Sequence, residues 1–265
     1  MSQNPLALNR LGVPTALPRR RSRLRRMRVT LGDRALTTLH IASFDRAEYR
    51  MRAVQLETTM PLAQWCNENG AGNAIVGGFF VRPSYQPLGE LRVDGRRRSV
   101  VPFDSPWGSV RACVHVDGAQ LTIARRHEIA AHPRGDLLQA GPLLVSGGEV
   151  VLSDGDDSEG FSAGAHQFDS DITRGRYPRA ALGISETRLL AVACDGRTPR
   201  DAGLTLGELA WVLRSLGASH ALNLDGGGSA SLVYGGRLRN RPREEHGIDL
   251  LNGRPVTTAL VFEAP

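Results

Sequence analysis

The chain has 265 residues, enough for one large domain or two small ones, and its 41% hydrophobic, 23% charged composition with 30 glycines is that of a turn-rich globular protein. All 33 basic residues are arginine, which excludes a Schiff-base lysine, and 27 residues are acidic. The sequence has no apolar run of about 18 residues, so we expect no membrane span.

The positive charge is concentrated at the start of the chain. Residues 1–28 contain eight arginines and no acidic residue, whereas the rest of the chain has 25 basic and 27 acidic residues. Because dense like charge without apolar periodicity opposes folding, we predict a disordered basic tail over residues 1–28 and one folded domain over residues 29–265. The nearly neutral domain argues against a nucleic-acid partner, and contact through the tail is the alternative.

The first part of the domain predicts strands and one short helix. Residues 36–44 and 49–56 have the alternation of half-buried strands, and residues 61–70 predict a helix that begins with a proline and ends with a glycine. Residues 74–80 predict a buried strand interrupted by two glycines. Residues 87–126 alternate short apolar segments with turns, which is typical of antiparallel sheets.

The cysteines and histidines form no recognisable disulfide or metal motif. Cys66, Cys113 and Cys194 are odd in number and far apart, so we expect buried free thiols. His127 and His132 are five residues apart, about 140° around a helix, and cannot bind a metal from one face. The sequence therefore offers no metal-ligand set.

Two polar segments in the middle of the chain predict loops. Residues 154–159 concentrate carboxylates but lack the ligand spacing of a calcium loop, so we interpret them as a solvated acidic loop. Residues 161–177 are polar and contain glycine, which suits a flap beside a site. Within them, His166, Asp169 and Asp171 are candidate substrate contacts, and exposed loop polarity is the alternative.

Apolar strands follow this loop region. Residues 178–184 and 189–195 predict neighbouring strands, with Arg179 and Asp195 near the strand ends, and residues 254–262 predict a closing strand. Side chains at strand ends are held by the sheet and remain accessible, so both residues are candidates for a site.

An amphipathic helix is predicted over residues 205–216. Thr205 is a favourable N-cap residue, Glu208 stands three positions later as in a capping box, and Gly217 ends the pattern. The capping position gives Glu208 a structural explanation, so it ranks below Asp225 as a catalytic candidate.

Residues 221–233 join an apolar strand to a carboxylate, three glycines and two hydroxyls. The glycines at 226–228 leave backbone N–H groups open to form an anion-binding concavity. Asp225 directly follows the strand, so secondary structure would hold it in place for chemistry. A tight turn capped by Asn223 and Asp225 is the alternative.

Residues 223–229, Asn-Leu-Asp-Gly-Gly-Gly-Ser, resemble the signature of the phosphodiester glycosidase family. Weaker segments resemble the family in the same order and rough spacing, from about residue 36 to residue 263: Gly-Gly-Phe-Phe at 77–80, Gln-Ala-Gly-Pro-Leu-Leu at 139–144, Pro-Arg-Ala-Ala-Leu-Gly at 178–183, Asp-Gly-Arg at 195–197, Leu-Thr-Leu-Gly-Glu-Leu-Ala at 204–210 and Arg-Pro-Val at 254–256. Val76 departs from the family pattern, in which an asparagine commonly precedes the Gly-Gly pair.

The strand and helix pattern predicts an α+β fold, a β-rich single domain with mixed, mainly antiparallel sheets and two or three helices.

The resemblance implies a hydrolase that cleaves the glycosidic bond of a sugar-1-phosphate diester, such as an α-N-acetylglucosaminyl phosphodiester. That reaction needs a carboxylate near the anomeric carbon and a cationic site for the phosphate. Asp225 is the first catalytic candidate, and Asp195 and then Glu208 are candidates for a second carboxylate. The candidate substrate-binding residues are Arg179, Asn223, Gly226, Gly227, Gly228, Ser229, Gly77, Gly78 and Arg254.

A non-catalytic module that binds an anionic or phosphorylated glycan is the alternative function, and Val76 favours it if the family's asparagine contacts substrate. The expected partner is a carbohydrate phosphodiester. The sequence establishes no cofactor, and a requirement for a divalent cation is left open. Because the sequence shows no signal-peptide pattern, the cytoplasm is the default location, although proteins similar to this family are often exported.

Overall fold

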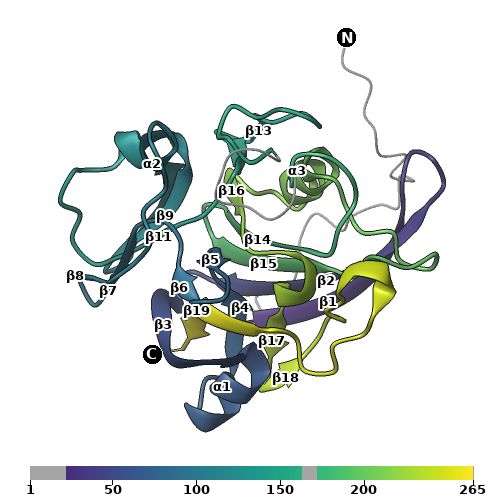
Figure 1. Cartoon of the computed structure of the whole chain (residues 1–265), viewed down its shortest axis with the longest axis horizontal. Coiled ribbons are helices and arrows are strands. Elements are labelled where there is room, and N and C mark those ends of the chain that lie inside the picture. The colour runs from purple at the N-terminus through teal and green to yellow at the C-terminus, as the bar shows by residue number, and fades with distance from the viewer. Residues whose placement is uncertain (1–21, 163–171, 265) are drawn as a thin grey trace.

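The computed structural model describes residues 22–162 and 172–264, which form a β-rich structure with three α-helices (Figure 1). The helices are α1 Leu62–Glu68, α2 Trp107–Val110 and α3 Leu206–Ser215, and none of these three has the length and apolar composition to cross a bilayer. All pairings between strands of the described residues are antiparallel. The predicted β-rich α+β fold with mainly antiparallel sheets is confirmed.

The largest sheet has seven strands. From one edge to the other they are β1 Ser22–Thr30, β2 Leu36–Asp45, β15 Arg188–Cys194, β14 Arg179–Ile184, β16 His220–Asn223, β12 Leu143–Ser146 and β13 Glu149–Val150. The segments 178–184 and 189–195, predicted as neighbouring strands, become β14 and β15 and pair directly. Strand β16, which leads into the glycine-rich segment, lies between β14 and β12.

Two smaller sheets and a short hairpin complete the fold. One five-stranded sheet has the order β18 Arg237–Leu238, β17 Leu232–Tyr234, β4 Asn73–Val76, β19 Pro255–Glu263 and β3 Arg50–Pro61. The other has the order β10 Gln120–Arg125, β9 Ala112–Asp117, β11 Asp136–Gln139, β7 Leu91–Val93 and β8 Arg96–Arg97. The hairpin pairs β5 Phe80–Val81 with β6 Gln86–Pro87.

The seven-stranded sheet separates two apolar cores. On one face, Phe44 of β2 stacks on Phe262 of β19, with ring centroids 4.5 Å apart, within the larger core. Helix α3 covers the other face, where its Leu209 and Leu213 belong to the second core (Figure 1). Because both faces are covered, every residue of β14 is buried, as expected of a central apolar strand.

Strand β1 corrects the end of the predicted disordered tail. Residues 22–28 of that segment lie within β1, which pairs with β2 along its whole length, so the prediction of disorder is wrong for them. The edge position of β1 explains the arginines, because Arg26 and Arg28 reach solvent while Val29 is buried. Residues 1–21 lie outside the described residues.

Helix α3 begins with the predicted capping box. The Glu208 backbone N–H donates to Thr205 Oγ1 at 3.1 Å, and the Thr205 N–H donates to Glu208 Oε2 at 2.9 Å. Gly217 follows the helix with a φ of +86°, the left-handed conformation expected of a helix-ending glycine.

The acidic segment 154–159 is only partly solvated. Glu159 is 3% exposed and accepts hydrogen bonds from the N–H groups of Ala112 and Leu143, so its interpretation as a solvated carboxylate is wrong. Asp154 accepts hydrogen bonds from the first turn of α3. Burial raises the pKa of the Glu159 carboxyl.

The three cysteines are buried and free, as predicted.

Candidate active site

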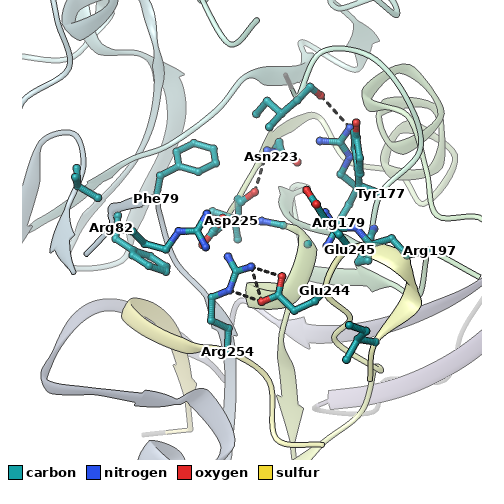
Figure 2. Close-up of a pocket in the computed structure, with 18 of the residues that line it drawn as sticks. Phe79, Arg82, Tyr177, Arg179, Arg197, Asn223, Asp225, Glu244, Glu245 and Arg254 are labelled. Atoms are coloured by element: carbon teal, nitrogen blue, oxygen red, sulfur yellow. Dashed lines mark hydrogen bonds and ion pairs between the residues drawn. The ribbon is translucent and has the colours of Figure 1, made fainter. Parts of the chain in front are cut away.

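A cavity of about 740 Å³ opens at the end of β16, within the usual size range of ligand pockets (Figure 2). It is lined by residues 79–82, Val101, Ile172, residues 177–179, Arg197, residues 223–227, residues 244–246, Ile248 and Arg254. The predicted site residues among them are Arg179, Asn223, Asp225, Gly226, Gly227 and Arg254. The predicted residues outside this lining are Gly77, Gly78, Asp195, Glu208, Gly228 and Ser229.

Asp225 lies at the centre of the cavity wall, where β16 ends and a glycine turn begins (Figure 2). Its backbone N–H donates to the Gly77 carbonyl at 3.0 Å, which ties it to the segment after β4. Its Oδ1 accepts the Gly226 N–H at 2.9 Å, and the 3-10 turn Gly227–Ser229 follows. One backbone hydrogen bond therefore fixes the Asp225 main chain, and another fixes its carboxylate.

Burial raises the pKa of the Asp225 carboxyl to about 6, because desolvation penalises the charged form more than nearby groups stabilise it. The Ser229 hydroxyl, the Arg254 guanidinium, the Gly226 N–H and the Arg82 guanidinium act in the opposite direction. Figure 2 shows Arg82 extending toward Asp225 from one side of the cavity. Asp225 is thus a carboxyl group that titrates near neutral pH beside two cations.

Arg254 is paired with Glu244 on the cavity wall. Its Nε and Nη2 donate to Glu244 Oε1 at 2.9 and 2.6 Å, and Nη2 also lies 2.5 Å from Oε2. The Arg254 backbone N–H donates to the Gly228 carbonyl at 3.0 Å, which connects the pair to the turn after Asp225. A Cβ at Gly228 would lie 2.9 Å from Glu244 Oε1, so a glycine there leaves room for the pair.

Arg179 is buried at the start of β14, and its side chain is fixed by backbone carbonyls. Its Nε donates to Leu204, and its Nη2 donates to Ile172 and Gly175. Burial lowers the pKa of its guanidinium to about 10, and the guanidinium carbon lies 5.1 Å from the centroid of the Tyr177 ring. Arg179 therefore braces the cavity wall through three carbonyl contacts.

Arg197 reaches the cavity from the turn after β15. Its backbone has a φ of +64°, a conformation uncommon for a residue with a side chain and often found at functional sites. Its Nη1 donates to the Arg243 carbonyl at 2.9 Å, and its guanidinium carbon lies 5.7 Å from the Tyr177 ring centroid. These contacts hold the guanidinium beside Gly227, where a Cβ would lie 3.5 Å from Nη1.

Asn223 closes the base of the cavity. Its Nδ2 donates to the carbonyls of Gly141 and Leu224 at 3.0 and 2.9 Å. The bond to Gly141 joins the end of β16 to the segment before β12.

The two alternative catalytic carboxylates make structural contacts away from the cavity lining. Asp195 is 1% exposed, with Oδ2 3.1 Å from His40 Nε2 and Oδ1 accepting the Arg241 N–H at 2.7 Å. Glu208 pairs with Arg176 at 2.6 Å in addition to capping α3. Both carboxylates connect parts of the fold, and neither faces the cavity.

Gly77 and Gly78 support the cavity from behind. A Cβ at Gly77 would lie 2.4 Å from Thr258 Oγ1, and one at Gly78 would lie 2.8 Å from the Gln139 carbonyl oxygen. The two glycines lie between β4 and β5, so the strand predicted over residues 74–80 is divided there, and they allow close backbone packing that a side chain would prevent. Ser229 is fully buried behind Asp225.

Several cavity residues are missing from the candidates derived from the sequence. They include Phe79, Arg82, Tyr177, Arg197, Glu244 and Glu245. Phe79 and Arg197 fall within the segments Gly-Gly-Phe-Phe and Asp-Gly-Arg, which carry the family resemblance and could have identified them. Glu244 and Glu245 lie in a charged loop whose sequence has no comparable signal.

No group of three or more metal-binding side chains occurs in residues 22–162 and 172–264. His166, Asp169 and Asp171, the candidate contacts in the predicted flap, lie outside the described residues.

Comparison with known proteins identifies the family. The family model described as phosphodiester glycosidase matches residues 69–263. The chain belongs to the phosphodiester glycosidase family. Among curated proteins, the chain is similar to N-acetylglucosamine-1-phosphodiester alpha-N-acetylglucosaminidase of Mus musculus, with 27% identity over 221 residues, 82% of this chain and 41% of the relative. The same enzyme of Homo sapiens is 27% identical over 194 residues, 71% of this chain and 37% of the relative. The chain therefore spans about two fifths of the length of these relatives.

Solved structures share the fold of this chain at lower identity. The zebrafish N-acetylglucosamine-1-phosphodiester alpha-N-acetylglucosaminidase catalytic domain, auto-inhibited by its pro-peptide, has a TM-score of 0.70 and 18% identity, covering 92% of this chain and 83% of that one. A hypothetical protein from Synechocystis has a TM-score of 0.63 and 20% identity, covering 92% and 62%. A putative exported protein from Burkholderia pseudomallei has a TM-score of 0.60 and 17% identity, covering 86% and 74%.

Proposed function

We propose that this member of the phosphodiester glycosidase family hydrolyses the glycosidic bond of a sugar-1-phosphate diester. The observation that carries the proposal is Asp225, a carboxyl group with a pKa of about 6 in a 740 Å³ cavity beside the guanidiniums of Arg254 and Arg82. The names of the curated relatives support an α-N-acetylglucosaminyl phosphodiester as the first substrate to test.

The chemistry of this bond explains the arrangement. The bond between the anomeric carbon and the phosphate oxygen breaks, and the phosphate monoester leaves with the electron pair as a stable anion. Nearby cations stabilise this anionic leaving group more than protonation would, and Arg254 and Arg82 supply them. Positive charge develops at the anomeric carbon, where the ionised Asp225 carboxylate stabilises it.

A second carboxylate would accept the proton of the water whose oxygen joins the anomeric carbon. Asp195 and Glu208 were the candidates from the sequence, but both are committed to structural contacts outside the cavity lining. Of the two other carboxylates lining the described cavity, Glu244 is paired with Arg254, whereas the Glu245 carboxylate makes no hydrogen bond or ion pair to another described residue. We assign the role of the base to Glu245.

The test is hydrolysis of a panel of sugar-1-phosphate diesters, including α-N-acetylglucosaminyl phosphodiesters, with and without a chelator. The wild type should release free sugar, and Asp225→Asn should lose at least ~10²-fold in kcat/KM. Asp94→Asn is the control, because the Asp94 side chain is 80% exposed and lies outside the cavity lining. Release by the Asp225→Asn variant at the wild-type rate would refute the role of Asp225.

The glycan-binding alternative rested on Val76, where the family commonly has asparagine. Val76 is fully buried in the larger core and lies outside the described cavity lining, so this departure does not alter the cavity wall. A protein that binds the diesters without releasing sugar from any of them would favour the alternative.

A further inference from the structure

The cavity has two chemically different walls, one on each side of Asp225. Figure 2 shows Phe79 and Arg82 on one side, Tyr177 and Arg197 on the other, and Asp225 between them. A sugar phosphodiester also has two unlike halves, the sugar and the alcohol, joined through the phosphate. The two walls therefore indicate which half of the substrate lies on each side.

The position of the phosphate follows from the cations nearest Asp225. Arg254 and Arg82 both line the cavity, and Figure 2 shows both side chains extending toward Asp225. The phosphate is bonded to the anomeric carbon, which must lie against Asp225 for the proposed reaction. The phosphate consequently lies at Arg254 and Arg82, and the rest of the alcohol extends past Arg82.

The wall on the Tyr177 side carries polar groups next to the apolar Pro178 and Ile248. Tyr177, Glu245 and His246 line it, and their side chains make no hydrogen bond to another described residue. Together with the Arg197 guanidinium they offer hydrogen-bond donors and acceptors, the groups that bind sugar hydroxyls. The sugar fits this wall.

The wall on the Arg82 side is apolar. Phe79, Phe80, Val81 and Val101 line it and offer no side-chain hydrogen-bonding group. Phe79 packs on Phe161 with ring centroids 5.5 Å apart, and Phe80 stacks on Tyr85 at 5.3 Å.

Backbone contacts hold this apolar wall together. The Val101 N–H donates to the Pro87 carbonyl at 2.9 Å, and Pro87 pairs with Phe80 in the β5–β6 hairpin, which brings Val101 beside β5. The wall is consequently a fixed hydrocarbon surface at the place where the alcohol leaves the phosphate.

We infer that the alcohol half of the substrate is apolar, so that the protein acts on sugar-1-phosphate esters of hydrophobic alcohols, with the hydrocarbon against Val81 and Val101. This inference rests on the proposed function and concerns the specificity of the same site. Burial of hydrocarbon contributes about 0.8 kcal/mol per methylene, close to fourfold in affinity for each.

The experiment measures kcat/KM for esters of one sugar-1-phosphate, the sugar released fastest in the panel above, with methanol, butanol, octanol, benzyl alcohol and the 6-hydroxyl of a hexose. We expect at least a tenfold rise from methyl to butyl and a hexose ester no better than methyl. A further rise from butyl to octyl identifies a chain alcohol, and a benzyl ester better than butyl identifies an aromatic one. Equal rates for the methyl, butyl and hexose esters would overturn the inference while leaving the proposed function intact.

Isosteric variants locate the effect on the apolar wall. Val81→Thr and Val101→Thr should lower kcat/KM for the butyl ester several-fold more than kcat/KM for the methyl ester. Val151→Thr is the matched control, because Val151 is 41% exposed and outside the cavity lining. Equal losses for both esters in the two wall variants would count against the assignment, and hydrolysis of no ester at all would refute the proposed function itself.

Discussion

Glu244 holds Arg254 in a forked ion pair, with three nitrogen–oxygen distances between 2.5 and 2.9 Å, on the wall that carries Asp225. The same fork geometry of an arginine suits a phosphate group. Under the proposed function, the Glu244 carboxylate therefore competes with the substrate phosphate for Arg254, and it partly neutralises the cation that acts on Asp225.

The Glu244→Gln variant tests this relationship through the pH dependence of activity. Without the carboxylate, Arg254 should act more strongly on Asp225, so the pKa of Asp225 should fall from about 6. The acid limb of the profile of kcat/KM against pH should move to lower pH by roughly half a unit or more, and KM should fall because the competing anion is gone.

The control for this variant is Glu263→Gln, which removes the carboxylate of a second Glu–Arg fork. Glu263 accepts from Arg52 at 3.0 and 3.2 Å outside the cavity lining, so neither the acid limb nor KM should change. An acid limb that stays in place together with a higher KM for Glu244→Gln would show that Glu244 positions Arg254 and does not compete with substrate.

Asp225 should make the fold less stable as the pH rises. Its pKa is about 6 in the folded protein against an ordinary value of 3.8, so the folded state holds the proton more tightly. This contribution to stability is fully present below about pH 4 and is lost as the pH rises through about 6, by at most about 3 kcal/mol. The Asp225→Asn variant avoids the loss, so its Tm should exceed that of the wild type more at pH 7.5 than at pH 4.5. A Tm difference that is constant across this range would contradict the raised pKa.

The sequence predicted the centre of the site because its signal is local. Asp225 and the following glycines are adjacent in the chain, and the strand before them positions them with little help from distant residues. The capping box of Glu208 was predictable for the same reason, since both partners lie within one helical turn.

Residues brought together by tertiary structure were not predictable in this way. Arg82 and Glu244 are more than 140 positions apart and line one cavity because β5 and the loop before β19 meet at the end of β16. Asp195 lies at a strand end, as predicted, but its side chain contacts His40 of the adjacent strand β2. The strand end was visible in the sequence, whereas the direction of the side chain was decided by sheet packing.

Glu208→Gln should lower stability and leave catalysis unchanged. The carboxylate is buried, pairs with Arg176 and caps α3, and loss of a charged hydrogen bond of this kind costs about 1–3 kcal/mol. Thermal unfolding should show a lower Tm, while kcat/KM of the folded protein stays within twofold. Glu149→Gln is the control, because the Glu149 side chain in its pair with Arg214 is 75% exposed and such pairs contribute little. A large loss of kcat at full folding would return Glu208 to the catalytic candidates.

Gly77→Ala should destabilise the fold by about 1–3 kcal/mol, the usual effect of forcing an extra methyl group into a packed site. The added Cβ would lie 2.4 Å from Thr258 Oγ1 and 2.8 Å from the Thr258 carbonyl carbon, so a backbone shift is needed to accommodate it. That shift would also move the Gly77 carbonyl, which accepts the Asp225 N–H, and kcat should fall together with stability. Gly72→Ala is the matched control, because no atom lies within 4 Å of a Cβ there. Denaturant unfolding and kcat measured on both variants decide the point, and a Gly77→Ala protein as stable and active as Gly72→Ala would show that Gly77 is not needed for this packing.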